Sequence, residues 1–182
     1  PAKLDEKEFE IPKSLNFNEW STQITGSDFL FDDYDINEEI DHLDGQTIEE
    51  AEHQIATRLY QNNARVHFNN HIEKDGRFGK RIIYGGYIIS LARAISCNGL
   101  ANAFKILAIH SGRHSAPTFS GDTIYAGSKI LDKKKINNSL GFLLVRTIAS
   151  KNEPKIDFPD KNNLSENMVL DLEYSVLIPV KI

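Results

Sequence analysis

The segment GGYIISLARAISCNGLANAF, residues 85–104, constrains the fold more than any other part of the sequence. Its apolar character and length favour a helix, which starts on two glycines and meets a natural stop near Asn98 and Gly99. Arg93 is its only charged residue. A helix with so little polar surface must be covered by other elements, so we expect it to be buried nearly all round.

Strand-like segments make up most of the second half of the chain. The last of them, NMVLDLEYSVLIPVK at 167–181, alternates apolar and polar residues as a half-buried strand does. An antiparallel sheet curled around the apolar helix would cover it, which predicts an α+β fold. The other strand-like segments are 104–114, 123–135 and 141–152, and a loop rich in Pro, Asn and Asp at 151–167 precedes the last strand.

The N-terminal part has a different character. Residues 1–31 are mixed and polar without a sustained period, so we expect an arm or linker that docks through Trp20, Phe29 and Phe31. The remainder, residues 32–182, is expected to form one domain, because its length suits a single hydrophobic core.

Two further elements are expected before the apolar segment. Residues 32–48 alternate partly and end in a turn at Asp44, which predicts a strand. Residues 48–62 have a helical period, with Thr47 as N-cap and Glu50 completing a capping box. The apolar face of this helix would consist of Ala51, Ile55, Leu59 and Tyr60.

Composition limits the partners and the location. The net charge of −5 argues against nucleic acid and against an anionic membrane surface as partners. No apolar run approaches the ~20 residues that span a bilayer. The one cysteine, Cys97, permits no internal disulfide, and with no secretory segment this predicts a cytoplasmic protein. Because Cys97 lies in the apolar segment, we expect a buried thiol.

An amide-rich run, QNNARVHFNN at 61–70, precedes the apolar segment and holds His67 among five amides. A histidine has an ordinary pKa of about 6.5, so it can act as base and acid near neutrality. The other interpretation is that the amides end a helix and that His67 is a packed loop residue. The residues alone favour this second interpretation.

Three stretches resemble the MaoC-like, (R)-specific enoyl-CoA hydratases, which have the hotdog fold, an antiparallel sheet wrapped around one long buried helix. LYQNNARVHFN (59–69) resembles the hydratase segment of that family, and RIIYGGYIIS (81–90) resembles its helix-start segment. APTFSGDTI (116–124) resembles its strand pair with proline, phenylalanine, glycine and aspartate. The resemblance implies a hotdog domain over residues 32–182.

The resemblance is closer to one branch of the family, the mesaconyl-CoA hydratases or β-methylmalyl-CoA dehydratases. This closer resemblance depends on six short stretches: TIEEAEH, ATRLYQN, ARVHF, GRFG, ISLARA and SGRH. Members of the branch have two hotdog halves in one chain, and this sequence resembles the second half. The resemblance therefore implies an acyl-CoA thioester substrate and either a homodimer or pairing with a second hotdog half.

Three residues fall on the family's catalytic positions. His67 matches the catalytic histidine, and Asn62 stands where the family has an aspartate. An asparagine can orient a water molecule but has no proton to lose, so His67 would carry the proton transfers. Gly85 matches the glycine whose N–H stabilises the oxyanion, and a helix N-terminus offers free N–H groups and a positive dipole end.

Substrate-binding residues are also implied. The Tyr84 hydroxyl could contact an acyl carboxylate, Ser90 could face the thioester, and Gly86 would serve close packing or the substrate. A dicarboxylic acyl group needs a cation for its free carboxylate, which arginine binds through two hydrogen bonds. The candidate cations are Arg65, Arg93 and Arg113, and the candidate carboxylates for an alternative base are Glu52, Glu73 and Asp75.

The leading interpretation is a hydro-lyase that hydrates a 2-enoyl-CoA, with mesaconyl-CoA as the expected substrate. No cofactor is expected because the thioester already activates the β-carbon. No metal is expected either, since the histidine pairs His67/His71 and His110/His114 lie in a loop and in a strand-like segment. The alternatives are a non-catalytic acyl-CoA-binding hotdog subunit that completes a partner's fold, and a thioesterase on the same fold.

Overall fold

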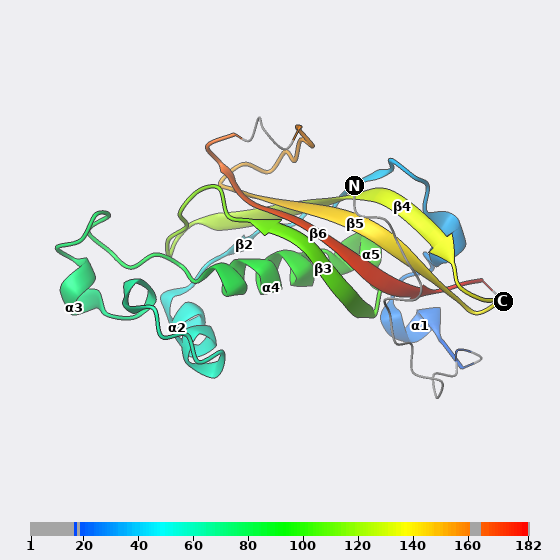
Figure 1. Ribbon diagram of the computed structural model, residues 1–182, viewed down its shortest axis with the longest axis horizontal. Helices are drawn as coiled ribbons and strands as arrows, with labels where there is room; N and C mark the ends of the chain where they lie inside the picture. Colours follow the sequence, from blue (N-terminus) through cyan, green and yellow to red (C-terminus); the bar gives the residue numbers. More distant parts are fainter. Residues whose placement is uncertain (1–16, 18, 161–164, 182) are drawn as a thin grey trace.

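A curved antiparallel sheet wraps around one long helix in the computed structural model, which describes residues 17, 19–160 and 165–181 (Figure 1). The strand order in this part of the chain is β1-β4-β5-β6-β3, and β2 pairs with the first residues of β4. The strands are β1 (Glu39–Asp41), β2 (Gln46–Thr47), β3 (Lys105–Arg113), β4 (Thr123–Lys135), β5 (Leu140–Lys151) and β6 (Met168–Pro179). The helices are α1 (Thr22–Thr25), η2 (Phe31–Asp33), α2 (Glu50–Leu59), η3 (Arg65–His67), α3 (Asn70–Glu73), α4 (Gly85–Ile95) and α5 (Cys97–Leu100).

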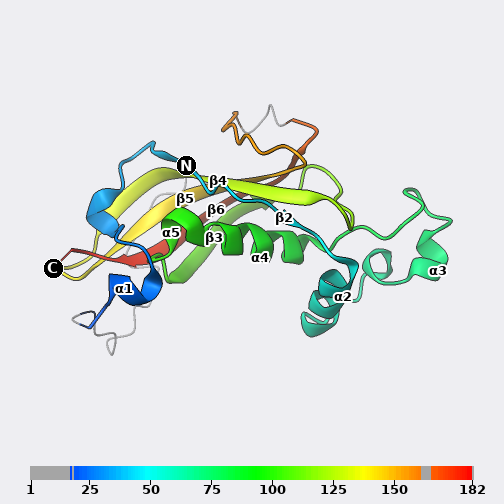
Figure 2. The same ribbon diagram turned by 180° about the vertical axis from the view of Figure 1, so that it is seen from behind.

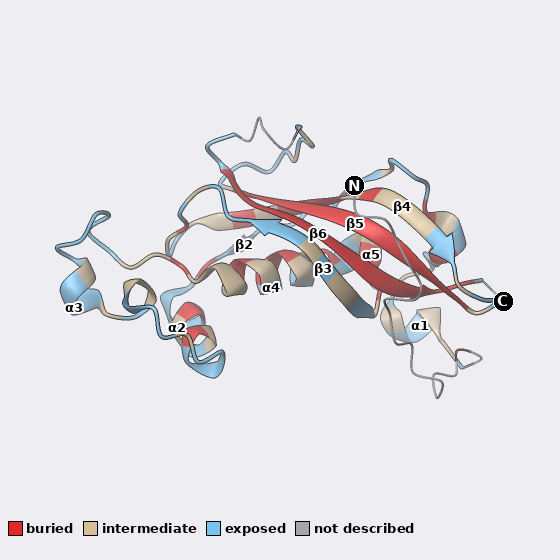
Figure 3. Cartoon of the chain, in the orientation of Figure 1, coloured by how far each residue is buried: buried red, intermediate tan, exposed pale blue. Residues whose placement is uncertain are grey.

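The prediction of an α+β fold with long C-terminal strands is confirmed. Each of the four strand-like segments forms one strand, and β5 and β6 pair along almost their whole length. Both strands are buried from end to end except at Lys151 (Figure 3). The short β1 and β2 replace the single strand expected over 32–48, because the chain turns away between Asp41 and Gln46.

Helix α4 buries one face in the concave side of the sheet. Ile88, Leu91 and Ala92 are buried, at the spacing of a single helical stripe. Ser90 and Ala94, on the opposite side, are exposed. The expectation of burial nearly all round is therefore wrong for this chain, because the sheet covers only one side of the helix.

The predicted stop of this helix is confirmed at the residues that suggested it. Asn98 and Gly99 have non-helical backbone angles, and Gly99 has a φ of 107° that a residue with a side chain rarely adopts. Helix α4 itself ends at Ile95, and the non-helical residues Asn98 and Gly99 lie within the short α5 that follows it. Cys97 begins α5 with its side chain exposed, so the expected buried thiol is wrong.

Helix α2 presents the reverse of the expected face to the protein. His53 and Thr57 are buried, whereas Ile55 is 57% and Leu59 73% exposed. The capping prediction is also wrong. Thr47 belongs to β2, where its hydroxyl lies 2.8 Å from that of Thr123 and so is not available to cap α2. Helix α2 lies beyond the N-terminal end of α4 in both views, away from the sheet that would cover an apolar face (Figures 1 and 2).

The expected arm is described only from Phe17, so residues 1–16 and 18 lie outside the described part of the chain. Trp20 makes the expected docking contact, since its Nε1–H donates to Asn102 Oδ1 at 2.9 Å and its ring packs on Phe104. Phe31 is buried, whereas Phe29 stays largely exposed. The boundary of the arm at residue 31 remains a prediction.

Candidate active site

A cavity of about 410 Å³ opens beside the first turn of α4. Three segments that are distant in sequence form its wall: the residues around η3, the start of α4, and the turn that follows β3. Most of the lining is apolar. The groups with chemistry are His67, Gly85 and His114, and the apolar lining includes Phe78, Ile82, Ile83, Ile88, Ala116 and Pro117. The structure thus brings two of the three predicted catalytic residues, His67 and Gly85, into one cavity.

His67 is held in one orientation. It ends the short helix η3, and its Nδ1 lies 3.0 Å from the carbonyl oxygen of Ile82. Because a carbonyl oxygen only accepts, Nδ1 carries the proton in this contact and Nε2 keeps a free lone pair. The Ile82 N–H donates in turn to the Val66 carbonyl at 3.2 Å, so two backbone segments fix the ring. This is the tautomer that a general base needs.

Gly85 is the first residue of α4, after the N-cap residue Tyr84, whose side chain makes no capping bond. The first N–H groups of a helix have no carbonyl one turn earlier to bond to, and the dipole of α4 makes this end positive. A Cβ on Gly85 would lie 2.6 Å from His114 Nε2, so only glycine lets that ring approach. A Cβ on Gly86 would instead meet the Tyr84 ring at 2.5 Å, which gives Gly86 a packing role.

His114 is the functional candidate that the sequence did not single out. It follows β3 directly, and its ring lies against Gly85 in the cavity wall. Desolvation lowers the pKa of His114, although a hydrogen bond with the Val169 backbone opposes this effect. The His114 ring is therefore expected to be neutral at pH 7. The cavity then offers two imidazoles and a helix N-terminus to a bound molecule.

The predicted binding residues Tyr84 and Ser90 border this region without lining the cavity. The Tyr84 ring packs on the His67 ring at 5.6 Å between centroids and on Tyr60 at 6.3 Å. Ser90 is exposed, and its hydroxyl donates to the Gly86 carbonyl at 3.0 Å. Tyr84 thus packs against His67, and the Ser90 hydroxyl bonds to its own helix.

The candidate cations lie at different distances from the cavity. Arg65 is 62% exposed and faces Glu73 at 3.6 Å. Arg93 donates to Ser96 Oγ at 2.7 Å and to the Ala103 carbonyl, at the far end of α4. Arg113 ends β3 immediately before His114, so it is the candidate nearest to the cavity along the chain.

Asn62 does not share the cavity with His67. Its Oδ1 accepts the Ala64 N–H at 2.8 Å, which closes a local turn after α2. It lines a separate cavity of about 350 Å³. The other residues of that cavity are Gln54, Thr57, Arg58, Phe68 and Arg81.

The alternative carboxylates lie outside the cavity of His67 as well. Glu52 accepts the Tyr87 hydroxyl at 3.0 Å, and Glu73 pairs with Arg65. Asp75 is exposed in the turn after α3. Within the described residues, then, no carboxylate lines the cavity that holds His67 and Gly85.

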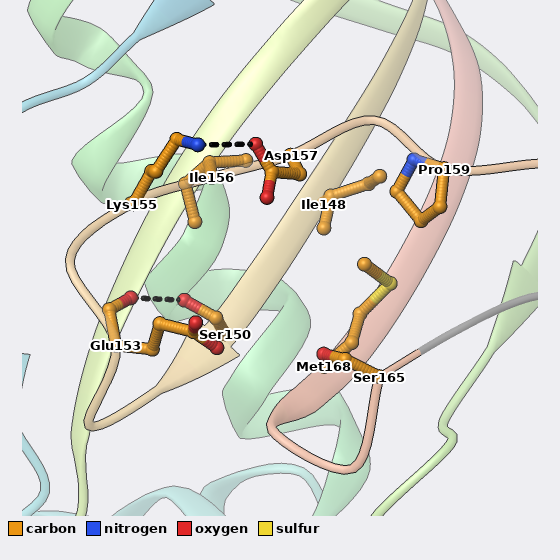
Figure 4. Close-up of a pocket in the computed structure, with 9 residues that line it drawn as sticks. All are labelled: Ile148, Ser150, Glu153, Lys155, Ile156, Asp157, Pro159, Ser165 and Met168. Atoms are coloured by element: carbon orange, nitrogen blue, oxygen red, sulfur yellow. Dashed lines mark hydrogen bonds and ion pairs between the residues drawn. The ribbon is translucent and has the colours of Figure 1, made fainter.

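A further cavity, of about 160 Å³, lies where the loop after β5 folds over the sheet (Figure 4). Ile148 and Met168 form its apolar floor, and the loop supplies an exposed ion pair of Lys155 and Asp157 at 3.3 Å. The described residues bring together no group of three His, Cys, Asp or Glu side chains suited to a metal ion. They also include no helix with the length and apolarity to cross a membrane.

Comparison with known proteins identifies close relatives. The chain is 53% identical over 184 residues to the β-methylmalyl-CoA dehydratase of Chloroflexus aurantiacus, covering 98% of this chain and 52% of that protein. It is 44% identical over 172 residues to the mesaconyl-CoA hydratase of Cereibacter sphaeroides, covering 93% of this chain and 49% of that protein. The chain thus spans about half the length of the curated relatives it matches. No protein-family model matches it.

Superposition on solved structures identifies the fold. A crystal structure of a MaoC domain protein dehydratase from Chloroflexus aurantiacus superposes with a TM-score of 0.88 at 53% identity, covering 95% of this chain and 51% of that one. A Mycobacterium tuberculosis protein with a double hotdog fold matches with a TM-score of 0.66 at 23% identity, covering 93% of this chain and 48% of that one, and shows the fold alone. The predicted hotdog fold is confirmed.

Proposed function

We propose that this chain, which belongs to the MaoC-like dehydratase family, is the catalytic hotdog half of a hydro-lyase that reversibly hydrates a 2-enoyl-CoA thioester. The expected substrate is mesaconyl-CoA, after the names of its two relatives. The observation that carries the proposal is the cavity in which a histidine with a free Nε2 meets the N-terminus of α4. Identity of 53% along almost the whole chain supports the reaction class.

The chemistry follows from two groups. His67 Nε2 takes a proton from water while the water oxygen bonds to the β-carbon of the enoyl group. The electrons of the double bond move onto the thioester oxygen, where the Gly85 N–H stabilises the enolate. The imidazolium of His67 then returns the proton to the α-carbon. No net proton or electron is left over, and the reverse sequence dehydrates the product.

A second hotdog half is part of the proposal. Helices α2 and α3 and the segment between them extend beyond the sheet in both views (Figures 1 and 2). Exposed large apolar side chains gather on this overhang, which is unusual for an isolated soluble surface. They are Ile55, Leu59, Tyr60, Phe68 and Ile72. Because the relatives are about twice as long, we expect a second copy or a separate N-terminal half to cover them.

We expect the purified chain to have the mass of at least a homodimer in light scattering at micromolar concentration, or to co-purify with an N-terminal half expressed beside it. The double substitution Ile55→Lys and Leu59→Glu should weaken that assembly because it places charges on the overhang. Ile24→Glu is the matched control, since Ile24 is 87% exposed on α1, at a distant place in the fold. A monodisperse monomer that does not bind the co-expressed half would contradict the proposed pairing of two hotdog halves.

Substrate choice gives a second expectation. If a cation binds the second carboxylate, mesaconyl-CoA should exceed crotonyl-CoA in kcat/KM. Arg113→Gln should reduce the ratio of the two kcat/KM values, because a charge-assisted pair contributes about 1.5–3 kcal/mol, roughly 10–10²-fold in that ratio. Arg65→Gln, which changes an exposed ion pair, is the control and should leave the ratio unchanged. Equal efficiency of the wild type on the two substrates would exclude dicarboxylate selection.

The second candidate function is a non-catalytic subunit that binds acyl-CoA for a partner. Its support is that Asn62 replaces the family's aspartate and lies in a different cavity from His67. One assay separates the two functions: the chain, alone and with its partner half, is incubated with mesaconyl-CoA and crotonyl-CoA. Loss of the enoyl-thioester absorbance supports catalysis, and binding without that loss supports the alternative.

A further inference from the structure

His53 is a buried histidine on α2, 1% exposed, that contacts the start of α4. Its Nε2 accepts the backbone N–H of Tyr84 at 2.9 Å, and Tyr84 is the residue immediately before Gly85. A backbone N–H can only donate, so Nε2 accepts in this contact, and a neutral ring then carries its proton on Nδ1, which lies 3.3 Å from the Gln54 amide nitrogen. Desolvation, with a smaller contribution from the charge of His67, lowers the pKa of His53 to about 4, which agrees with a neutral ring at pH 7.

The next residue, Gln54, reaches the other catalytic segment. Its Nε2 donates to the carbonyl oxygen of His67 at 2.9 Å. The His53 and His67 rings also meet edge to face, with centroids 6.4 Å apart and planes at 86°. Adjacent side chains of one helix therefore hold both parts of the site, because successive helical residues point about 100° apart and can reach two different segments.

We propose that His53 and Gln54 of α2 are positioning residues that together fix the separation between the His67 imidazole and the N-terminus of α4. The inference rests on the proposed function and adds to it residues that never touch the substrate. His67 lies on a short helix between turns, and Gly85 begins α4 after an irregular segment. The His67 imidazole and the Gly85 N–H therefore need a third element to hold them in place, since a displacement of about 1 Å at a reacting centre can lower the rate roughly 10²-fold.

The kinetic test compares two substitutions at His53. In His53→Gln the side-chain oxygen can replace Nε2 as acceptor for the Tyr84 N–H, whereas His53→Leu fills similar space without an acceptor. We expect His53→Leu to lower kcat on mesaconyl-CoA by about 10–10²-fold with little change in KM, and His53→Gln to recover most of that loss. Gln54→Leu should lower kcat in the same way, because it releases the His67 carbonyl.

A purely structural role for His53 predicts a different pattern. Val145→Ala, a cavity-forming change in β5, serves as the control for lost stability, since Val145 is fully buried away from the cavity of His67. If His53→Leu and His53→Gln have equal kcat, or if kcat falls only as far as in a Val145→Ala variant of equal thermal stability, the positioning role is wrong. Unequal kcat at equal folded fraction supports it.

A measurement that needs no activity completes the test. Nitrogen-15 NMR of the wild-type chain in its assembled form should show His53 with an unprotonated Nε2 and a protonated Nδ1 from pH 7 down to pH 5. The Tyr84 amide resonance should move in His53→Leu and much less in His53→Gln. A protonated Nε2 overturns the positioning role whatever the activity. The expected tautomer in a chain without turnover overturns the proposed function and leaves the His53–Tyr84 contact established.

Discussion

His67→Ala is expected to lower kcat by about 10²–10⁴-fold, the usual contribution of a positioned acid–base group, with little change in KM. The structure gives the reason. The Ile82 carbonyl holds Nδ1–H, so Nε2 is the nitrogen available to take a proton from water. The measurement is steady-state hydration of mesaconyl-CoA, followed by loss of the enoyl-thioester absorbance.

His67→Asn is the informative companion, because its amide N–H can replace Nδ1–H in the bond to Ile82 while offering no base. We expect it to be as inactive as the alanine variant and better folded. Asn62→Ala should lower kcat much less, because Asn62 closes a local turn with Ala64 and does not line the cavity of His67. Retention of most activity in well-folded His67→Ala would make His67 structural and leave His114 as the remaining imidazole of the cavity.

The strands and the central helix could be predicted because their signals are local. The alternation in 167–181 and the apolar run from Gly85 to the stop at Asn98 and Gly99 each reflect the surroundings of a single element. The start of α2 differs from the prediction because a distant contact overrides a local signal. Thr47 is a good N-cap by type, but pairing with β4 places it in a strand instead.

The face of α2 and the membership of the site depend on distant contacts that periodicity does not encode. The apolar residues Ile55 and Leu59 are exposed in this chain. In our proposal, the surface that covers them belongs to the second hotdog half. His114 reaches Gly85 only because β3 ends beside the start of α4, and the Tyr84 N–H satisfies the buried Nε2 of His53. The family resemblance predicts His67 and Gly85 as site residues, and both line the same cavity. It also places Asn62 beside His67, but in the structure Asn62 lines a different cavity.

Gly85→Pro should lower kcat by about 10²–10³-fold relative to Gly85→Ala, because it removes the N–H that would stabilise the enolate. Proline is tolerated at the first position of a helix, where its missing N–H has no helical partner. The preceding residue is compatible as well, since Tyr84 has φ −66° and ψ 128°, within the region that proline allows to its neighbour. Removal of the donor therefore need not disrupt α4.

The comparison with Gly85→Ala isolates the donor from the steric effect. Both side chains place a Cβ where it would meet His114 Nε2 at 2.6 Å, so both displace that ring, and only proline lacks the N–H. We expect the alanine variant to lose some activity through the displaced ring and the proline variant to lose a further 10²-fold or more, about 2.7 kcal/mol of transition-state stabilisation. Circular dichroism checks that α4 persists. Equal kcat in two folded variants would show that the Gly85 N–H stabilises no developing charge, and the oxyanion donor would then have to come from elsewhere in the assembled site.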